Sequence, residues 1–247
     1  VAPSQTLGDK EYQMLRTSAL NIISELNITG GCNVQYALNP DSFEYCVIEV
    51  NPRVSRSSAL ASKASGYPIA RVSAKIGIGM TLDEIPLANT PASFEPALDY
   101  VVTKMPRFPF DKFADADNSL STQMKATGEV MSIGRTVEES LLKAVRSLEI
   151  GLFHLYDAKF DDMTETQLLD YIQIGTDDRI YAIAQLLRLG CDIDRIHSVS
   201  AIDAFFLQKL SHIVQMEQLL QEHPGDSKFL KMAKQTGFSD KEIGLLW

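Results

Sequence analysis

The sequence has little of what disulfide frameworks and zinc sites require. It contains three cysteines, and Cys32, Cys46 and Cys191 include no pair with Cys-x-x-Cys spacing. All four histidines lie after residue 150, and none is spaced with another histidine or a cysteine as a pair of metal ligands. We therefore expect neither a disulfide framework nor a zinc site, and we expect a reducing compartment, the cytoplasm, as the location.

A long hydrophobic segment is also missing. The longest apolar runs fall far short of the about 20 residues that a membrane-spanning helix needs. The start of the chain has no signal-peptide pattern. We therefore expect no membrane association. The chain begins at Val1 with no initiator methionine and with a loop-like segment, which favours a piece of a longer protein.

Positive charge is in short supply as well. The chain carries 23 Lys and Arg against 32 Asp and Glu, a net charge of −9. Contact with a nucleic-acid backbone needs clustered Lys and Arg, so we expect no nucleic-acid partner. A small anionic substrate stays open, because a few local arginines suffice for it. The 45% hydrophobic and 22% charged residues are ordinary for a globular protein of one or two domains.

The first 149 residues mix helical and strand-like patterns. Apolar residues recur at helical spacing over residues 8–26. Alternation over Asn33–Leu38 and Tyr45–Asn51, around an Asn-Pro-Asp-Ser turn, predicts a hairpin. Strict alternation places Tyr45, Val47, Glu49 and Asn51 on one face of its second strand. The other expected elements are helices at 57–65, from 68, from a capping box at Thr81 and at 136–148, and strands at 100–104 and 128–133.

Helix signals alone remain after about residue 149. A long amphipathic helix is predicted over Ala201–Glu222, and Gly190 and Gly237 stand where helices would stop. The pairs with N-terminal cap spacing are Thr164 with Gln167, Ser200 with Asp203, and Ser239 with Glu242. We therefore expect an α+β portion at residues 1–149 and an all-α domain at residues 150–247.

The hairpin carries a set of polar residues that suggests chemistry. Glu49 lies in an otherwise apolar strand, and burial of a lone carboxylate is costly unless a cation or strong donors accompany it. Asn51 is two residues on and shares its face, and hairpin pairing brings Gln35 opposite. One carboxylate and two amide oxygens are hard ligands of the kind that Mg²⁺ takes, with substrate phosphates completing the shell.

Two arginines follow at once on the loop that leaves this strand. Arg53 and Arg56 carry guanidinium groups suited to phosphate oxygens, and Ser57 and Ser58 stand at an expected helix start, where free N–H groups attract anions. Metal ligands beside an arginine pair suit phosphoryl transfer. The alternative is that a strand Glu and two loop arginines are ordinary surface residues. Their combination favours a metal–phosphate site.

Several long runs of sequence carry a specific likeness. Residues 32–40 read CNVQYALNP and residues 47–64 read VIEVNPRVSRSSALASKA. Shorter runs with the same likeness are FEP at 94–96, DYVVTK at 99–104, PRF at 106–108, QMK at 123–125, GEVM at 128–131 and IGRT at 133–136. Together they resemble the large subunit of carbamoyl-phosphate synthase. The resemblance is dense over residues 1–149 and looser through the helical region.

The resemblance implies a fold and a set of site residues. Residues 1–149 would be the C-terminal portion of an ATP-grasp domain that makes carboxyphosphate, and residues 150–247 a truncated helical oligomerisation domain. The metal ligands of that family, for Mg²⁺ or Mn²⁺, fall on Gln35, Glu49 and Asn51. Its nucleotide-binding residues fall on Gln35 and Glu49, and its phosphate-facing catalytic arginines on Arg53 and Arg56.

The resemblance also implies a reaction and partners. ATP phosphorylates bicarbonate, and ammonia that a glutaminase small subunit releases from glutamine then gives carbamate. The expected partners are that subunit, the rest of the large subunit, and further copies through the helical domain. As a piece, the chain is expected to lack turnover. A second hypothesis is a non-catalytic helical assembly module, and a third is a helical nucleic-acid binder that uses Lys228, Lys231 and Lys234.

Overall fold

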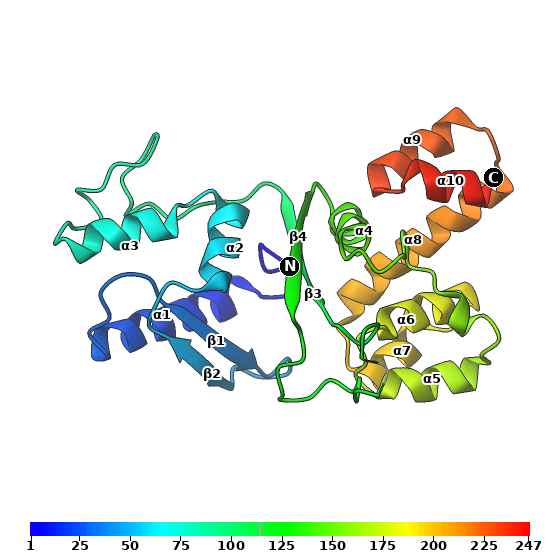
Figure 1. The fold of residues 1–247 in the computed structure, drawn as a ribbon, viewed down its shortest axis with the longest axis horizontal. Coiled ribbons are helices and arrows are strands. Elements are labelled where there is room, and N and C mark those ends of the chain that lie inside the picture. Colours follow the sequence, from blue (N-terminus) through cyan, green and yellow to red (C-terminus); the bar gives the residue numbers. More distant parts are fainter. Residues whose placement is uncertain (114) are drawn as a thin grey trace. The chain divides into compact units, whose positions relative to one another are not determined.

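The chain folds into two compact units. One comprises Ser4–Asp99, and the other joins Val1–Pro3 to Tyr100–Trp247. The computed structural model describes residues 1–113 and 115–247 (Figure 1). The predicted domain boundary near residue 150 is a different division and stays a prediction.

The unit of residues 4–99 contains a helix, a hairpin and two more helices. Its elements are α1 (Asp9–Glu25), β1 (Asn33–Leu38), β2 (Tyr45–Asn51), α2 (Arg56–Ser65) and α3 (Ile69–Gly77). The two strands pair antiparallel and have the predicted bounds. Helix α2 ends at Gly66, whose positive φ of 72° gives the left-handed conformation that closes helices and that glycine adopts without strain.

The helix predicted from Thr81 is wrong. The backbone N–H and hydroxyl of Thr81 do donate to the Glu84 carboxylate, at 2.9 and 2.8 Å, as in a capping box. The chain nevertheless makes only turns there. Pro86 has no N–H to donate and disfavours helical backbone at Ile85, so a helix started at Thr81 cannot continue. Ile85 is instead fully buried against Val72 and Ala92.

The second unit begins with a two-stranded sheet covered by a helix. Strands β3 (Val101–Arg107) and β4 (Gly128–Gly134) pair antiparallel. Helix α4 (Val137–Ser147) packs on both strands (Figure 1). The Thr103 and Ser140 hydroxyls, 2.7 Å apart and buried, join the sheet to this helix.

Helices make up the rest of this unit. They are the 3₁₀ turn η1 (Ala158–Phe160), α5 (Glu165–Gln173), α6 (Arg179–Arg188), α7 (Ile193–Ser200), α8 (Ala204–Glu222), α9 (Ser227–Thr236) and α10 (Asp240–Leu246). No helix within residues 1–113 and 115–247 is long and apolar enough to cross a membrane. Small antiparallel sheets with helices, followed by a helical region, confirm the predicted fold class.

The cap predicted at Ser200 is wrong, while those at Thr164 and Ser239 are confirmed. Asp203 begins α8, because its carboxylate accepts from the Phe205 N–H at 2.8 Å. The Ser200 hydroxyl donates instead to the Ile196 carbonyl at 2.7 Å, at the end of α7. Helix α8 therefore starts three residues later than predicted.

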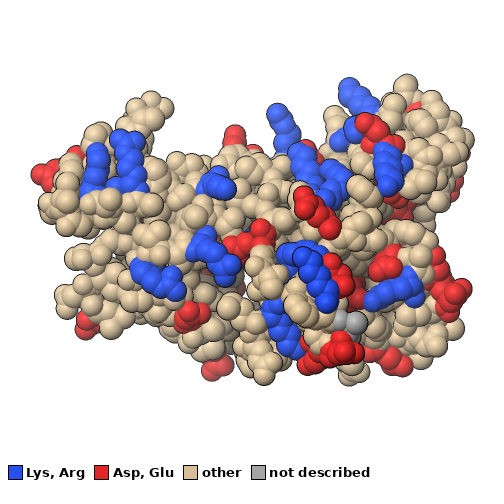
Figure 2. Space-filling view, viewed as in Figure 1, with Lys and Arg blue, Asp and Glu red and all other residues tan. Residues whose placement is uncertain are grey.

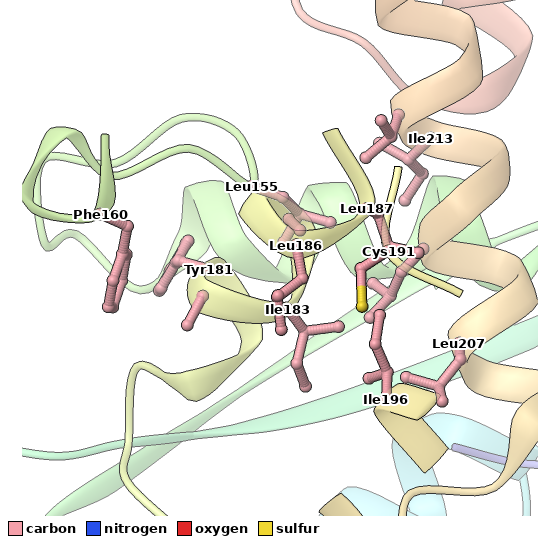
Figure 3. Packing of buried hydrophobic residues seen from close by; sticks show 14 of the residues in the cluster. Leu155, Phe160, Tyr181, Ile183, Leu186, Leu187, Cys191, Ile196, Leu207 and Ile213 are labelled. Atoms are coloured by element: carbon pink, nitrogen blue, oxygen red, sulfur yellow. The ribbon is translucent and has the colours of Figure 1, made fainter. Parts of the chain in front are cut away.

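The main hydrophobic core lies within the second unit, Val1–Pro3 with Tyr100–Trp247, which we call the helical unit. Figure 3 shows side chains of α6, α7 and α8 meeting there, with Ile196 of α7 next to Leu207 of α8. The unit of residues 4–99 has only a small buried cluster of Val72, Ile85 and Ala92, and α1 has no buried residue. The hairpin of the predicted site is therefore an exposed element.

Candidate phosphate and metal site

The register of the hairpin brings the predicted ligands together. Gln35 pairs with Glu49 and Asn33 with Asn51, and the next pair is Tyr36 with Val47. One residue of β2, Ile48, is thus extra, which makes a β-bulge. Because directly paired residues share a face of a sheet, Gln35, Glu49 and Asn51 emerge on the same side.

Their side chains also contact one another. The Gln35 amide Nε2 lies 3.4 Å from one oxygen of the Glu49 carboxylate. The Asn51 Nδ2 donates to the other oxygen at 2.7 Å. Gln35 reaches the Asn33 Oδ1 as well, at 3.4 Å. Glu49 is thus the centre of a row of amides, and Asn33 is a fourth member that the sequence reasoning missed, although strand pairing with Asn51 would have pointed to it.

The bulge corrects the predicted alternation of β2. Strict alternation put Tyr45 and Val47 on the face of Glu49, and this is wrong. Val47 pairs with Tyr36 and so lies on the other face. The Tyr36 and Tyr45 rings meet edge to face there, with centroids 5.7 Å apart. The extra residue Ile48 shifts the alternation by one position, so the polar face carries Cys46 in place of Tyr45 and Val47.

The expected burial of Glu49 is also wrong. Glu49 is exposed, as are Val47 and Ile48 beside it, at 44% and 62% of their full accessible area. A two-stranded hairpin has no neighbouring strand or second layer of its own to cover either face. The carboxylate is therefore held by two amide N–H groups on an open surface, where a ligand can reach it.

The donor set fits a magnesium ion that is shared with phosphate oxygens. Among residues 1–113 and 115–247 no group of three His, Cys, Asp or Glu side chains is placed to hold a metal. Glu49 supplies one carboxylate, and half-turns of the Gln35 and Asn51 amides would present their oxygens in place of their N–H groups. One carboxylate with neutral oxygens is a partial shell, which Mg²⁺ accepts when phosphates and water complete it.

The two arginines lie on the segment that follows β2 and leads into α2. The Arg53 N–H donates to the Asn51 carbonyl at 2.8 Å, which turns the chain sharply at the strand end. Arg56 is the first residue of α2. Both side chains are exposed, and neither forms an ion pair with any residue in the described part of the chain. Their guanidinium groups are therefore free to bind an anion.

The start of α2 is built from serines. The Ser55 N–H donates to the Ser58 hydroxyl at 3.1 Å, and the Ser55 and Ser57 hydroxyls lie 2.6 Å apart. Free N–H groups and the helix dipole at this end favour negative charge. Together with the arginines, they add a positive side to a site whose other side is the Glu49 carboxylate.

Two family models match the chain. The model described as carbamoyl-phosphate synthase L chain, ATP binding domain, matches residues 1–85. The model described as carbamoyl-phosphate synthetase large chain, oligomerisation domain, matches residues 129–247. The chain belongs to the carbamoyl-phosphate synthase large-chain family. This membership makes it part of an ATP-dependent ligase family, and all the predicted site residues lie within the ATP-binding match.

Of the three lysines of α9, Lys234 is engaged with neighbouring residues. The Lys234 ammonium donates to the Phe238 carbonyl at 3.1 Å and to the Asp240 carboxylate at 2.9 Å. Lys228 lies over the Phe229 ring. On the face that Figure 2 shows, Lys and Arg are interspersed with Asp and Glu on the helical unit. This arrangement is that of a solvated, mixed-charge surface and favours the oligomerisation-domain match over the nucleic-acid hypothesis.

Proposed function

We propose that this chain forms part of the site at which a carbamoyl-phosphate synthase phosphorylates bicarbonate with ATP. The observation that supports this best is the row of Gln35, Glu49 and Asn51 on one face of the hairpin. Arg53 and Arg56, on the segment that follows β2, make no ion pair with a described residue. Family membership accounts for the use of ATP. Bicarbonate and ammonia as substrates, and the residue roles, are part of the proposal.

In this reaction an oxygen of bicarbonate attacks the γ-phosphorus of ATP, and the bond to the bridging oxygen of the departing ADP breaks. Negative charge spreads over the phosphoryl oxygens as carboxyphosphate forms, and catalysis is mainly positioning and charge neutralisation. Arg53 and Arg56 would bind these oxygens through their guanidinium forks. Ammonia then attacks the carbonyl carbon of carboxyphosphate, and phosphate leaves to give carbamate.

The amide row has a distinct role in the proposal. Glu49, with Gln35 and Asn51, would hold Mg²⁺ or Mn²⁺ together with the ATP phosphates. The bound cation would neutralise phosphate charge. Glu49 supplies the one charged oxygen ligand, and the Gln35 and Asn51 amides, whose N–H groups now contact that carboxylate at 3.4 and 2.7 Å, would turn to add their oxygens. Gln35 and Glu49 would thereby also fix the position of the nucleotide.

The proposal extends to partners. A glutaminase small subunit would release ammonia from glutamine, the remainder of the large subunit would complete the nucleotide site, and the reaction would run in the cytoplasm. The helical region would join copies of the enzyme. The exposed hairpin supports the need for further protein around the site, because an ATP site excludes water and these strands are open.

The test is the substitution Glu49→Ala in a synthase large chain that carries this sequence. Bicarbonate-dependent ATP hydrolysis should be abolished, because the only carboxylate of the row is gone. Glu44→Gln is the matched control, since Glu44 is an exposed carboxylate in the turn of the same hairpin. Retained hydrolysis in Glu49→Ala would remove this site from the mechanism.

A non-catalytic assembly role is the second candidate. The oligomerisation-domain match over residues 129–247 favours it. Light scattering of this chain at several concentrations should then show association that grows with concentration. A strict monomer throughout would count against assembly through the helical region.

A further inference from the structure

The helical unit contains a cavity that the ATP-site proposal does not use. Its volume is about 430 Å³, and it lies between the end of β3, the segment that follows α4, and the start of α6. Leu148, Ile150 and Leu152 give it an apolar wall, and Asp177, Arg179 and Tyr181 line it from the other side. This is the size and mixed character of small-molecule sites.

One buried group in the wall lacks a partner. Tyr181 is 3% exposed, and its hydroxyl makes no hydrogen bond within the described part of the chain. Burial, together with the negative charge of Asp157, Asp177 and Asp178, raises the pKa of Tyr181, so the hydroxyl keeps its proton. Buried polar groups are nearly always hydrogen-bonded, so the Tyr181 hydroxyl is an exception within the described residues.

Two neighbouring carboxylates in the cavity wall, Asp177 and Asp178, differ in whether they already have partners in the chain. Asp178 is fully engaged, because it accepts from the Tyr171 hydroxyl at 2.7 Å and the Thr176 hydroxyl at 2.8 Å and pairs with Lys159. The side chain of Asp177 makes no ion pair with a described residue, although its own backbone N–H and the charges of Lys159 and Arg107 act on it. Burial and the nearby Asp178 charge raise the pKa of Asp177. Asp177 is thus the carboxylate of this pair that stays available to a cation.

The two arginines that line the cavity, Arg107 and Arg179, also differ in whether they have partners. Arg107 is engaged, because it donates to the Asp111 carboxylate at 2.7 Å and to the Phe108 carbonyl. Arg179 lines the cavity and makes no ion pair in the described part of the chain, not even with Asp177 two residues before it. Asp177 and Arg179 are thus two opposite charges that line one cavity, and neither makes an ion pair in the described part of the chain.

We propose that this cavity binds a small zwitterion of the α-amino-acid class with an apolar side chain. Asp177 receives the ammonium group, and Arg179 receives the carboxylate. The apolar side chain of the ligand lies against Leu148 and Ile150. The site uses no residue of the hairpin, so its test is independent of the proposed ATP chemistry.

Calorimetric titration of the 247-residue chain tests this with three matched probes. L-leucine carries both charges, 3-methylbutylamine keeps its side chain and ammonium, and 4-methylpentanoate keeps its side chain and carboxylate. Each charge-assisted contact that is lost should weaken binding at least about tenfold. Leucine should therefore bind at least about tenfold more tightly than either single-charge probe. An amine that binds as well as leucine, or no saturable binding of leucine, would overturn the proposal.

Variants test which residue binds the ammonium group of the ligand and which binds its carboxylate. Asp177→Asn should weaken leucine at least about tenfold and leave 4-methylpentanoate unchanged, whereas Arg179→Gln should weaken leucine and leave 3-methylbutylamine unchanged. Asp162→Asn is the control, since Asp162 is exposed and does not line the cavity. Circular dichroism confirms that each variant folds, and Arg179→Gln provides a second route if Asp177→Asn does not. Leucine binding that is unchanged in a folded Asp177→Asn or Arg179→Gln variant would contradict the assignment.

Discussion

At the scale of single residues, Glu217 shows how a buried charge is made tolerable. Its carboxylate lies in α8 with 8% of the side chain exposed, and it accepts from His154 Nε2 and Arg188 Nε, each at 2.7 Å. A second Arg188 nitrogen adds a bond at 2.8 Å. Burial raises the pKa of Glu217, but the hydrogen bonds from His154 and Arg188 outweigh it and leave the pKa below its usual range.

Replacing Glu217 by Gln should destabilise the helical unit by about 3–5 kcal/mol near neutral pH, because the half-buried Arg188 is left without its counter-charge. Glu222→Gln, at the exposed end of α8, should change the stability little. Urea unfolding followed by circular dichroism measures both.

The same variant carries a pH signature. A carboxylate whose pKa is lowered by folding contributes stability above its unfolded pKa of about 4.3, and this contribution is lost as the pH falls through the folded pKa. The gap between the parent chain and Glu217→Gln should therefore shrink on acidification. A gap that stays constant from neutral pH down to about 3 would show that the charge of Glu217 is not the cause.

Tyr181→Phe, unlike Glu217→Gln, should not lower the stability of the helical unit. The Tyr181 hydroxyl is buried and has no partner within the described residues, so its removal takes away an unsatisfied donor and leaves the ring in place. Such a change is close to neutral or stabilising. Thermal unfolding should show an unchanged or higher Tm. A loss above about 1 kcal/mol would reveal a hydrogen bond that the structure lacks.

At the scale of elements, the sequence predicted what local patterns encode. The strands Asn33–Leu38 and Tyr45–Asn51 have their predicted bounds, because alternation and a turn cluster define a hairpin locally. The bulge at Ile48 could not be read, since an extra residue is visible only in the pairing with Gln35 and Tyr36. The meeting of Gln35, Glu49 and Asn51 was predictable from pairing, whereas the exposure of Glu49 depends on which layers cover the hairpin.

The predicted helix starts were wrong where two sequence signals favoured different structures. The capping box at Thr81 is made, but Pro86 stops the helix that it would begin. Ser200 and Asp203 both suit a cap, and only the backbone decides: α7 extends to Ser200, so Asp203 caps α8. A cap pattern marks a possible start, and the residues after the cap decide whether a helix forms.

Gly237 is an element-scale test, since it closes α9 with a φ of +103°. A Cβ there would lie 2.8 Å from the Glu139 Cα, in the backbone of α4. Gly237→Ala should cost about 1–2 kcal/mol in strain and a further about 1–3 kcal/mol through this clash. Gly225→Ala is the matched control, because Gly225 has a φ of +78° and open space around its Cβ position. Equal losses in urea unfolding would show that no clash occurs.

At the scale of the whole molecule, the two units differ in how much they bury. Among the described residues, the helical unit holds a core of 24 buried residues, whereas the unit of residues 4–99 has a buried apolar cluster of three. Because protection from exchange follows burial and cooperative packing, amides of α6 and α8 should exchange hydrogen far more slowly than those of β1 and β2. Mass-spectrometric exchange of this chain measures the contrast. Equal protection would mean that the hairpin is stabilised by more than its own contacts.

In the proposed site, Glu49 and its two amides hold the metal of a metal–ATP complex. Water-proton relaxation with Mn²⁺ and ATP, on a synthase large chain that carries this sequence, measures that binding directly. Glu49→Gln should weaken metal–ATP binding at least about tenfold, because the charged ligand is lost. Glu44→Gln should leave it unchanged. Equal Mn²⁺ binding in Glu49→Gln and the parent chain would contradict the account.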